Sequence, residues 1–377
     1  MNQERKYKFI ISGGGTGGHV FPAIAIGSCL RERFPSAEIL FVGAENRMEM
    51  EKVPEAGFDI VGLPVSGFIR KITLKNLIVI ARLLKSMIKA SKIVRKFAPD
   101  LAIGVGGYAS GPLIRAASKQ NIPVLLQEQN SYAGVTNKIL SKKADKICVA
   151  YDDMEKYFPP EKIIITGNPV RRDLIKINKE KNEANQYFGL IPARKTVLIL
   201  GGSLGARTIN QSLMNYVGDL AKSGHQLIWQ TGKLYYQQVK TVVTTKENTN
   251  IKVHDFLNRM DLAYAAADVI ISRAGAGTIS ELCIVGKPVI LVPSPNVAEN
   301  HQEKNAMALV KKNAAIMITD KDALENLVHQ LLKLIDDKKS CEELSSNMIS
   351  MAKPDATSKI VDEAVKLIKT NNPAHGF

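Results

Sequence analysis

Four glycine-rich turns constrain what this chain can fold into more than any other feature of its sequence. They lie at residues 13–19, 106–111, 201–207 and 273–278, and each separates a short apolar run from a helical stretch. Glycine allows positive φ and close approach of the backbone to a ligand, and the helix that follows favours an anion at its N-terminus. One such turn is equally well explained as a tight connection. Four of them predict diphosphate-binding sites at the carboxyl ends of parallel strands.

Short apolar runs alternate with helical stretches, which is typical of α/β proteins with parallel sheets. Two series of six strands are predicted, at 8–12, 39–42, 101–105, 124–127, 146–150 and 163–166, and at 196–200, 226–230, 251–254, 269–272, 289–292 and 315–318. Helices are expected at 22–34, 209–223 and 358–369, among others. We predict two doubly wound Rossmann-like domains, 1–167 and 168–352, and a C-terminal segment, 353–377, whose helix returns to the first domain.

Three short motifs indicate other chemistry, and each match is weak. Gly13-x-Gly15-x-x-Gly18 fits the dinucleotide fingerprint of dehydrogenases, but the expected acidic residue, Glu45, lies 27 residues beyond Gly18. Residues 201–205 fit the G-x-S-x-G elbow of hydrolases, but no H-G-G-G motif accompanies them. Residues 320–322 have the D-x-D form of a metal site, but their place after the last strand favours a cap of the next helix.

The net charge of +15 is concentrated in one interval of the chain. No acidic residue lies between Asp59 and Asp100, whereas nine basic residues do: Arg70, Lys71, Lys75, Arg82, Lys85, Lys89, Lys92, Arg95 and Lys96. The spacing of Arg82, Lys85, Lys89, Lys92 and Lys96 places them in one stripe along a helix. Apolar residues flank the stripe or form the opposite, core-like face: Ala81, Leu84 and Ile88 flank it, and Val79, Ile80, Leu83, Met87, Val94 and Phe97 lie opposite.

A basic stripe beside apolar residues suits an anionic membrane surface, although a solvated helix face explains the pattern equally well. Nucleic acid is not expected as a partner, because no binding motif is present and no aromatic residue interrupts the stripe. No apolar run approaches the length of a membrane span, and the polar start of the chain is unlike a signal peptide. The four separated cysteines predict reduced thiols rather than a zinc site or disulfides.

Several longer motifs, taken in order, resemble one family over almost the whole chain. They are residues 14–22 (GGTGGHVFP), 106–112 (GGYASGP), 128–130 (EQN), 167–171 (GNPVR), 201–207 (GGSLGAR), 273–281 (RAGAGTISE) and 300–306 (NHQEKNA). The family is the MurG peptidoglycan N-acetylglucosaminyltransferases, which have the GT-B fold of two Rossmann-like domains facing across a cleft. One position departs from the pattern, because Gly277 stands where we associate leucine or methionine with some members.

The resemblance implies transfer of GlcNAc from UDP-GlcNAc to the 4-hydroxyl of MurNAc in lipid I, giving lipid II with inversion. The C-terminal domain would hold the donor, with Glu281 on the ribose, Arg171 and Ser203 on the phosphates and Gln302 on the sugar. The full set of implied donor-binding residues is Thr16, Gly17, Gly18, Asn130, Arg171, Ser203, Leu257, Met260, Ala276, Gly277, Thr278, Ile279, Ser280, Glu281 and Gln302. The implied acceptor-binding residues are Gly14, Gly15, Gly106, Gly107, Tyr108 and Ser110.

An inverting transfer needs a base for the acceptor hydroxyl and stabilisation of the departing UDP. His19 is the first candidate base, because imidazole titrates near neutral pH and the residue follows a diphosphate loop. Glu128 is the rival candidate base. The other interpretation of Glu128 is a carboxylate that only supports neighbouring residues of the site. The reaction requires no metal held by the protein, and Mg²⁺ on a diphosphate stays open.

Together with the basic stripe, the resemblance predicts a place at the cytoplasmic face of the plasma (inner) membrane. Peripheral binding through Arg82, Lys85, Lys89 and Lys92 is expected from the stripe itself. Other cell-wall synthesis proteins are expected partners beside UDP-GlcNAc and lipid I. The alternatives are another GT-B enzyme acting on UDP-sugars (an epimerase or a glycolipid glycosyltransferase), a nicotinamide-dependent dehydrogenase, and a non-enzymatic basic binding protein.

Overall fold

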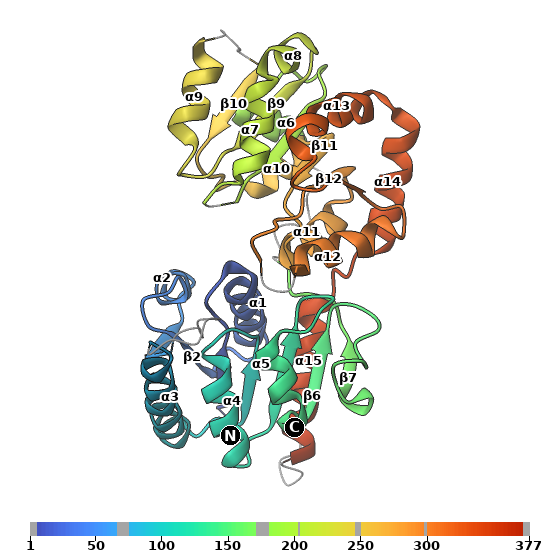
Figure 1. Ribbon diagram of the computed structural model, residues 1–377. Helices are drawn as coiled ribbons and strands as arrows, with labels where there is room; N and C mark the ends of the chain where they lie inside the picture. Colours follow the sequence, from blue (N-terminus) through green and yellow to red (C-terminus); the bar gives the residue numbers. More distant parts are fainter. Residues whose placement is uncertain are drawn as a thin grey trace. The chain divides into compact units, whose positions relative to one another are not determined.

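The computed structural model describes residues 6–65, 75–170, 181–202, 204–245, 250–297 and 300–371. The chain forms two compact units: residues up to Val170 together with those from Asp355 onward, and residues from Arg171 to Pro354. The first boundary lies three residues beyond the predicted one. The C-terminal helix α15 (Ala356–Asn371) belongs to the first unit, where it packs beside α1 (Gly17–Arg33) (Figure 1).

The first unit is a seven-stranded parallel sheet with helices on both faces. Its strands, in the spatial order β3-β2-β1-β4-β5-β6-β7, are β1 (Lys8–Ser12), β2 (Glu38–Ala44), β3 (Asp59–Leu63), β4 (Leu101–Gly104), β5 (Val124–Glu128), β6 (Lys146–Val149) and β7 (Ile163–Ile165). Its other helices are α2 (Glu49–Glu55), α3 (Lys75–Phe97), α4 (Ser110–Lys119) and α5 (Val135–Leu140). Alternate strand residues face opposite sides, so Phe9 and Ile11 pack with α1 and α15, whereas Ile10 packs with α3 and α4.

The second unit repeats this plan with a six-stranded parallel sheet. Its strands, in the order β10-β9-β8-β11-β12-β13, are β8 (Thr196–Leu200), β9 (Gln226–Gln230), β10 (Ile251–His254), β11 (Val269–Ser272), β12 (Val289–Leu291) and β13 (Ile316–Met317). Its helices are α6 (Lys181–Phe188), α7 (Arg207–Asn215), α8 (Val217–Lys222), α9 (Tyr236–Thr245), α10 (Met260–Ala266), α11 (Ala276–Val285), α12 (His301–Val310), α13 (Ala323–Asp336) and α14 (Lys338–Ser350).

The strand order explains why the glycine turns come in pairs. In each sheet the order reverses direction at one point, between β1 and β4 in the first unit and between β8 and β11 in the second. The four glycine turns follow these four strands. Ligands of open α/β sheets bind outside the carboxyl ends of strands at such a reversal, so each unit offers one site at its pair of turns.

Some sequence expectations need correction. Strand β3 was not predicted; it is a short edge strand that carries an aspartate and a glycine, Asp59 and Gly62. Helix α1 begins at Gly17 rather than at Pro22, and Pro22 lies inside the helix. The helix expected over 209–223 is interrupted at Tyr216 and forms α7 and α8.

Helix α3 carries both the basic stripe and an exposed apolar strip. Leu84 and Ile88 are 57% and 62% exposed, and Ile80 is 45% exposed, although we predicted Ile80 to face the core. Val79 and Val94 are buried as predicted, and the buried face also includes Ser86 and Ala90. The Ser86 hydroxyl donates to the backbone carbonyl of Arg82 in the same helix. In the part of the chain described above, no helix is both long and apolar enough to cross a membrane.

Candidate active site

The first glycine turn is shaped by a buried carboxylate that sequence analysis did not identify. Glu49, the first residue of α2, is fully buried and accepts hydrogen bonds from the backbone N–H of Ala44 (3.0 Å) and of Gly15 (3.0 and 3.1 Å to its two oxygens). A Cβ at Gly14 would lie 2.1 Å from its Oε1, and one at Gly43 would lie 2.6 Å from its Cγ. Both glycines are therefore needed to make room for Glu49.

The first and second turns pack against each other through backbone. Gly14 donates its N–H to the carbonyl of Gly106 (3.4 Å), and a Cβ at Gly107 would lie only 2.2 Å from the Gly14 oxygen. Gly107 also has φ +89°. This position therefore requires glycine both for the close approach of Gly14 and for its positive φ. Ser110 is fully buried and donates its hydroxyl to the carbonyls of Ser12 and Gly106, at 2.9 Å each.

These contacts change which groups are available to an acceptor diphosphate. The N–H groups of Gly14 and Gly15 and the Ser110 hydroxyl, which we predicted to bind the acceptor, are engaged within the protein. The N–H groups of Gly17 and Gly18 lie in the first turn of α1, where a helix provides no carbonyl partner. The Tyr108 ring is half-exposed and lies beside Gly15, so it borders the same surface.

His19 occupies the third position of α1, with its ring against the second turn. A Cβ at Gly106 would lie 2.9 Å from both Nδ1 and Cε1 of the ring, so glycine is required beneath it. Nδ1 lies 2.8 Å from Oε1 of Gln129, which follows β5. The ring is half-buried, and Nε2 has no partner among the described residues. The geometry therefore leaves one ring nitrogen of His19 open to a ligand.

Glu128, the rival base, is in a different situation. It is 1% exposed, and its Oε1 accepts from the backbone N–H and the side-chain amide of Asn130, at 3.1 and 3.2 Å. Its Oε2 accepts from the Gly134 N–H (3.0 Å) and the Asn137 amide (2.9 Å). A carboxylate with four N–H donors and no exposed surface is poorly placed to take a proton from a substrate. Its geometry favours a role in holding Asn130.

In the second unit, the fourth glycine turn leads into α11. The N–H groups of Gly277 and Thr278 lie in its first turn and have no helical partner. The side chains of Ala276 and Ile279 are buried, and Ser280 donates its hydroxyl to the Ala276 carbonyl, so the segment presents mainly backbone. A Cβ at Gly277 would meet nothing within 4 Å, so packing within the protein does not require the glycine that departs from the family pattern.

Glu281 lies one turn further along α11 and is held by a residue that sequence analysis missed. The hydroxyl of Tyr264, a residue of α10 that is 1% exposed, donates to Oε2 of Glu281 at 3.2 Å. Leu257 is buried in the same core cluster as Tyr264, and Met260 packs against it partly buried. A half-buried carboxylate held by a buried tyrosine can accept hydrogen bonds from ribose hydroxyls.

Gln302, in the first helical turn of α12, is hydrogen-bonded to the fourth glycine turn. Its Oε1 accepts from the backbone N–H of Ala274 (3.2 Å) and Ser294 (2.9 Å), so only its amide N–H₂ remains for a sugar hydroxyl. Arg273, at the start of the turn, donates to the carbonyls of Val292 (3.0 Å) and Pro293 (3.2 Å) and pairs with Asp320.

The third turn, after β8, has positive φ at Gly202 and Gly205, and a Cβ at Gly205 would lie 2.5 Å from the Thr231 carbonyl. The predicted phosphate ligands Arg171 and Ser203 lie outside the described residues.

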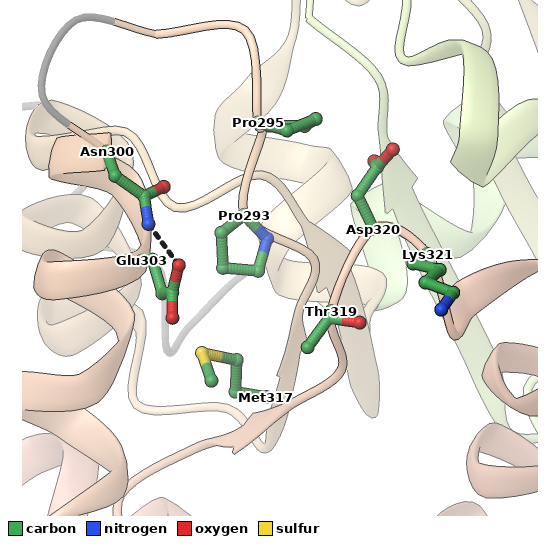
Figure 2. Close-up of a pocket in the computed structure, with 8 residues that line it drawn as sticks. All are labelled: Pro293, Pro295, Asn300, Glu303, Met317, Thr319, Asp320 and Lys321. Atoms are coloured by element: carbon green, nitrogen blue, oxygen red, sulfur yellow. Dashed lines mark hydrogen bonds between the residues drawn. The ribbon is translucent and has the colours of Figure 1, made fainter.

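A pocket of about 320 Å³ lies beside the ends of β12 and β13, and its lining includes residues on either side of Gln302 and of Ser294, to which Gln302 is bonded. Figure 2 shows its lining: Pro293, Pro295, Asn300, Glu303, Met317, Thr319, Asp320 and Lys321. Asp320 contacts Arg273 and Thr208, and Asp322 accepts from the Thr319 hydroxyl rather than capping α13 with its side chain. Across the described ranges, no group of three or more His, Cys, Asp or Glu is arranged to hold a metal ion.

Both units of the chain match known protein families. Residues 9–149 match the glycosyltransferase family 28 N-terminal domain, and residues 196–360 match the glycosyltransferase family 28 C-terminal domain. A transferase from Parabacteroides distasonis is 58% identical over 364 residues, which cover 97% of this chain and 99% of the relative. It is named UDP-N-acetylglucosamine–N-acetylmuramyl-(pentapeptide) pyrophosphoryl-undecaprenol N-acetylglucosamine transferase, as is a relative from Christiangramia forsetii that is 54% identical over 96% of this chain and 98% of its own.

Among solved structures, the crystal structure of MurG from Acinetobacter baumannii is similar, with a TM-score of 0.77, 27% identity and coverage of 96% of this chain and 100% of that one. A UDP-GlcNAc 2-epimerase from Neisseria meningitidis has a TM-score of 0.68 at 17% identity, over 96% of this chain and 100% of its own, and therefore shares the fold alone. The GT-B fold and the resemblance noted in the sequence are thus confirmed. The chain belongs to glycosyltransferase family 28, among the MurG transferases.

Proposed function

We propose that the protein transfers GlcNAc from UDP-GlcNAc to the 4-hydroxyl of MurNAc in lipid I, forming lipid II with inversion at the anomeric carbon. The observation that carries this function is the open Nε2 of His19, placed at the N-terminus of α1 beside the second glycine turn. The full-length relatives named for this transfer support the choice of substrates.

In the first unit, the acceptor diphosphate would bind at the N–H groups of Gly17 and Gly18 and beside Tyr108. Nε2 of His19 would accept the proton of the 4-hydroxyl as its oxygen attacks the anomeric carbon. The bond from that carbon to the UDP oxygen breaks as the new bond forms. A single displacement of this kind inverts the anomeric carbon.

In the second unit, Glu281 would accept hydrogen bonds from the ribose hydroxyls, with its oxygen oriented by Tyr264. The first turn of α11 would stabilise the negative charge that develops on the departing diphosphate, and Arg171 and Ser203 would contribute to the same task. The amide of Gln302 would donate to a GlcNAc hydroxyl. These groups supply positive potential without a protein-bound metal, and Mg²⁺ would act only as a counter-ion on a diphosphate.

The direct test is incubation of radiolabelled UDP-GlcNAc with a lipid I analogue, with measurement of sugar incorporation and UDP release. His19→Ala should lower turnover by about 10²-fold or more, the usual contribution of a general base, and leave UDP binding intact. His329→Ala, an exposed histidine on α13, is the matched control. Conversion of UDP-GlcNAc to another sugar nucleotide without incorporation would instead indicate an epimerase.

We further propose that α3 attaches the enzyme peripherally to the anionic cytoplasmic face of the plasma membrane. Exposed Ile80, Leu84 and Ile88 adjoin the basic residues, an arrangement that buries apolar surface at an interface while cations meet lipid headgroups. Lys89 already pairs with Glu45 at 3.0 Å, but both side chains are about two-fifths exposed and such a pair contributes little.

The membrane proposal predicts that changing Lys85, Lys89 and Lys92 together to Glu weakens binding to vesicles containing anionic lipid, and that added salt weakens the wild type in the same way. The control changes three exposed lysines of equal charge, Lys338, Lys339 and Lys353, to Glu. Equal binding of the two triple variants would refute a specific role for α3.

A further inference from the structure

Gln129 makes the one side-chain hydrogen bond that the structure describes to the His19 ring, and it is itself 1% exposed. We propose that Gln129 is a positioning residue that fixes the tautomer of His19, so that Nδ1 carries the proton and Nε2 presents a lone pair to the acceptor hydroxyl. This inference rests on the proposed function, because it identifies which atom of His19 serves as the base.

The orientation of the Gln129 amide follows from its neighbours. Its Nε2 lies 2.8 Å from the Val105 carbonyl and 3.2 Å from the Gln127 carbonyl. Backbone carbonyl oxygens only accept hydrogen bonds, so the amide nitrogen must face them. The amide oxygen therefore faces the histidine ring, and a flipped amide would set oxygen against two oxygens.

The tautomer follows in turn. The Gln129 oxygen can only accept, and it lies 2.8 Å from Nδ1 of His19, so Nδ1 must donate. A neutral imidazole with its proton on Nδ1 has its lone pair on Nε2. The ring nitrogen that makes no hydrogen bond with a described residue is thus the basic one.

A chain of buried amides keeps Gln129 in this orientation. Asn168 donates its amide to the Gln129 carbonyl (3.0 Å), which obliges its oxygen to face the Gln127 amide nitrogen (3.0 Å). The Gln127 side-chain oxygen consequently accepts from Gln129. Both ends of the chain are fixed by backbone carbonyls, and all three side chains are at most 2% exposed.

The nearby carboxylates bind other groups, so the neutral amide of Gln129 is the group that orients the His19 ring. Glu49 binds the N–H groups of Ala44 and Gly15, and Glu128 binds Asn130, Gly134 and Asn137. Tyr108 lies beside Gly15, and Gly106 contributes only backbone. A neutral acceptor orients the ring without the added stabilisation of its protonated form that a carboxylate provides.

The test compares wild type, Gln129→Glu and Gln129→Leu by long-range ¹H–¹⁵N NMR of the histidine rings and by the pH dependence of GlcNAc transfer. His19 signals are assigned by their absence in His19→Ala. We expect the Nδ1–H tautomer in the wild type, and in Gln129→Leu a mixture of tautomers with kcat/KM at least about 10-fold lower. In Gln129→Glu the new carboxylate favours the protonated ring, so the acidic limb of the pH profile should move upward by about one pH unit.

Gln120→Glu, the same change at a half-buried amide that bonds Ser91, should leave the pH profile unchanged. An Nε2–H tautomer in the wild type, or an unmoved acidic limb in Gln129→Glu, would overturn the inference. Absence of GlcNAc transfer by the wild type would refute the proposed function instead, and the NMR measurement of the tautomer would still decide the role of Gln129.

Discussion

Replacement of Glu49 by Gln tests whether a buried carboxylate sets the conformation of the first glycine turn. The carboxylate accepts the N–H of Ala44 and, with both oxygens, the N–H of Gly15. In Glu49→Gln one oxygen is kept, but the amide N–H₂ faces a backbone N–H, donor against donor. The change is nearly isosteric, so its effect comes from lost charge and lost acceptors.

The magnitude follows from these contacts. A hydrogen bond to a charged group contributes about 1.5–3 kcal/mol, and one such bond is lost while the other is weakened. If the substitution destabilises the native conformation of the first glycine turn by about 2 kcal/mol, the population of that conformation falls by about 30-fold, since about 1.4 kcal/mol corresponds to a factor of ten. We therefore expect kcat/KM for a lipid I analogue to fall by about 30-fold, because Gly17, Gly18 and His19 follow directly from this turn.

The assay is steady-state kinetics with each substrate varied, together with calorimetric titration of UDP and the unfolding temperature. UDP binding should be unchanged, because the second unit is proposed to hold the nucleotide. Glu51→Gln, the same change on an exposed residue of α2, should have no effect beyond about 0.5 kcal/mol. Wild-type kinetics in Glu49→Gln would refute the role of the carboxylate, and loss of UDP binding would show instead that the whole protein had unfolded.

Two further changes probe the second unit. Tyr264→Phe removes one hydrogen bond to the Glu281 carboxylate, so the KM for UDP-GlcNAc should rise by about 5–10-fold, for about 1–1.5 kcal/mol, with the KM for the acceptor unchanged. Burial lowers the pKa of His254 below its unfolded value of 6.5, partly opposed by the charge of Asp255, and its buried Nε2 has no partner. As pH falls below about 6.5, the unfolded chain takes up a proton at His254 that the folded chain resists, so the folded protein becomes less stable. Between about pH 7.5 and 5.5, the unfolding temperature should therefore drop less in His254→Leu than in the wild type. Equal drops in the two proteins would contradict this.

Much of the fold could be predicted because parallel strands buried on both faces are continuous apolar runs. Strands β1, β8, β9, β10 and β11 have the predicted bounds. Strand β3 was missed because an edge strand with Asp59 and Gly62 lacks that signal. The position of Ile80 was missed because helical periodicity gives the direction of a face less accurately than its existence, and the buried face of α3 includes Ser86.

The candidate site divides in the same way. His19 and Glu281 could be named from the sequence because they belong to recognisable glycine motifs. The role of His19 was predicted from its place after a turn, and that of Glu281 from the family resemblance. Glu49, Gln129 and Tyr264 could not be named in this way, because each acts on a partner 34, 110 or 17 residues away. Gln129 had one signal, its place between Glu128 and Asn130, whereas nothing in the sequence distinguished Glu49 from an ordinary helical glutamate.

The residues that were missed share a physical logic. Glu49 and Glu128 are buried carboxylates: Glu49 lies beside a turn proposed to receive a diphosphate, and Glu128 holds the loop of Asn130 and Gly134. A buried negative charge is unfavourable unless N–H donors stabilise it. Each carboxylate accepts hydrogen bonds from backbone N–H groups of its loop, and in this way fixes the conformation of that loop. The turns are therefore shaped before any substrate binds, and binding need not supply the free energy of ordering them. Gln129 extends the same principle to chemistry, since a neutral amide orients His19 while leaving its lone pair available. The site is thus organised by acceptors inside the protein, and the donors that remain open, at Gly17, Gly18, Gly277 and Thr278, are those that the substrates are proposed to use.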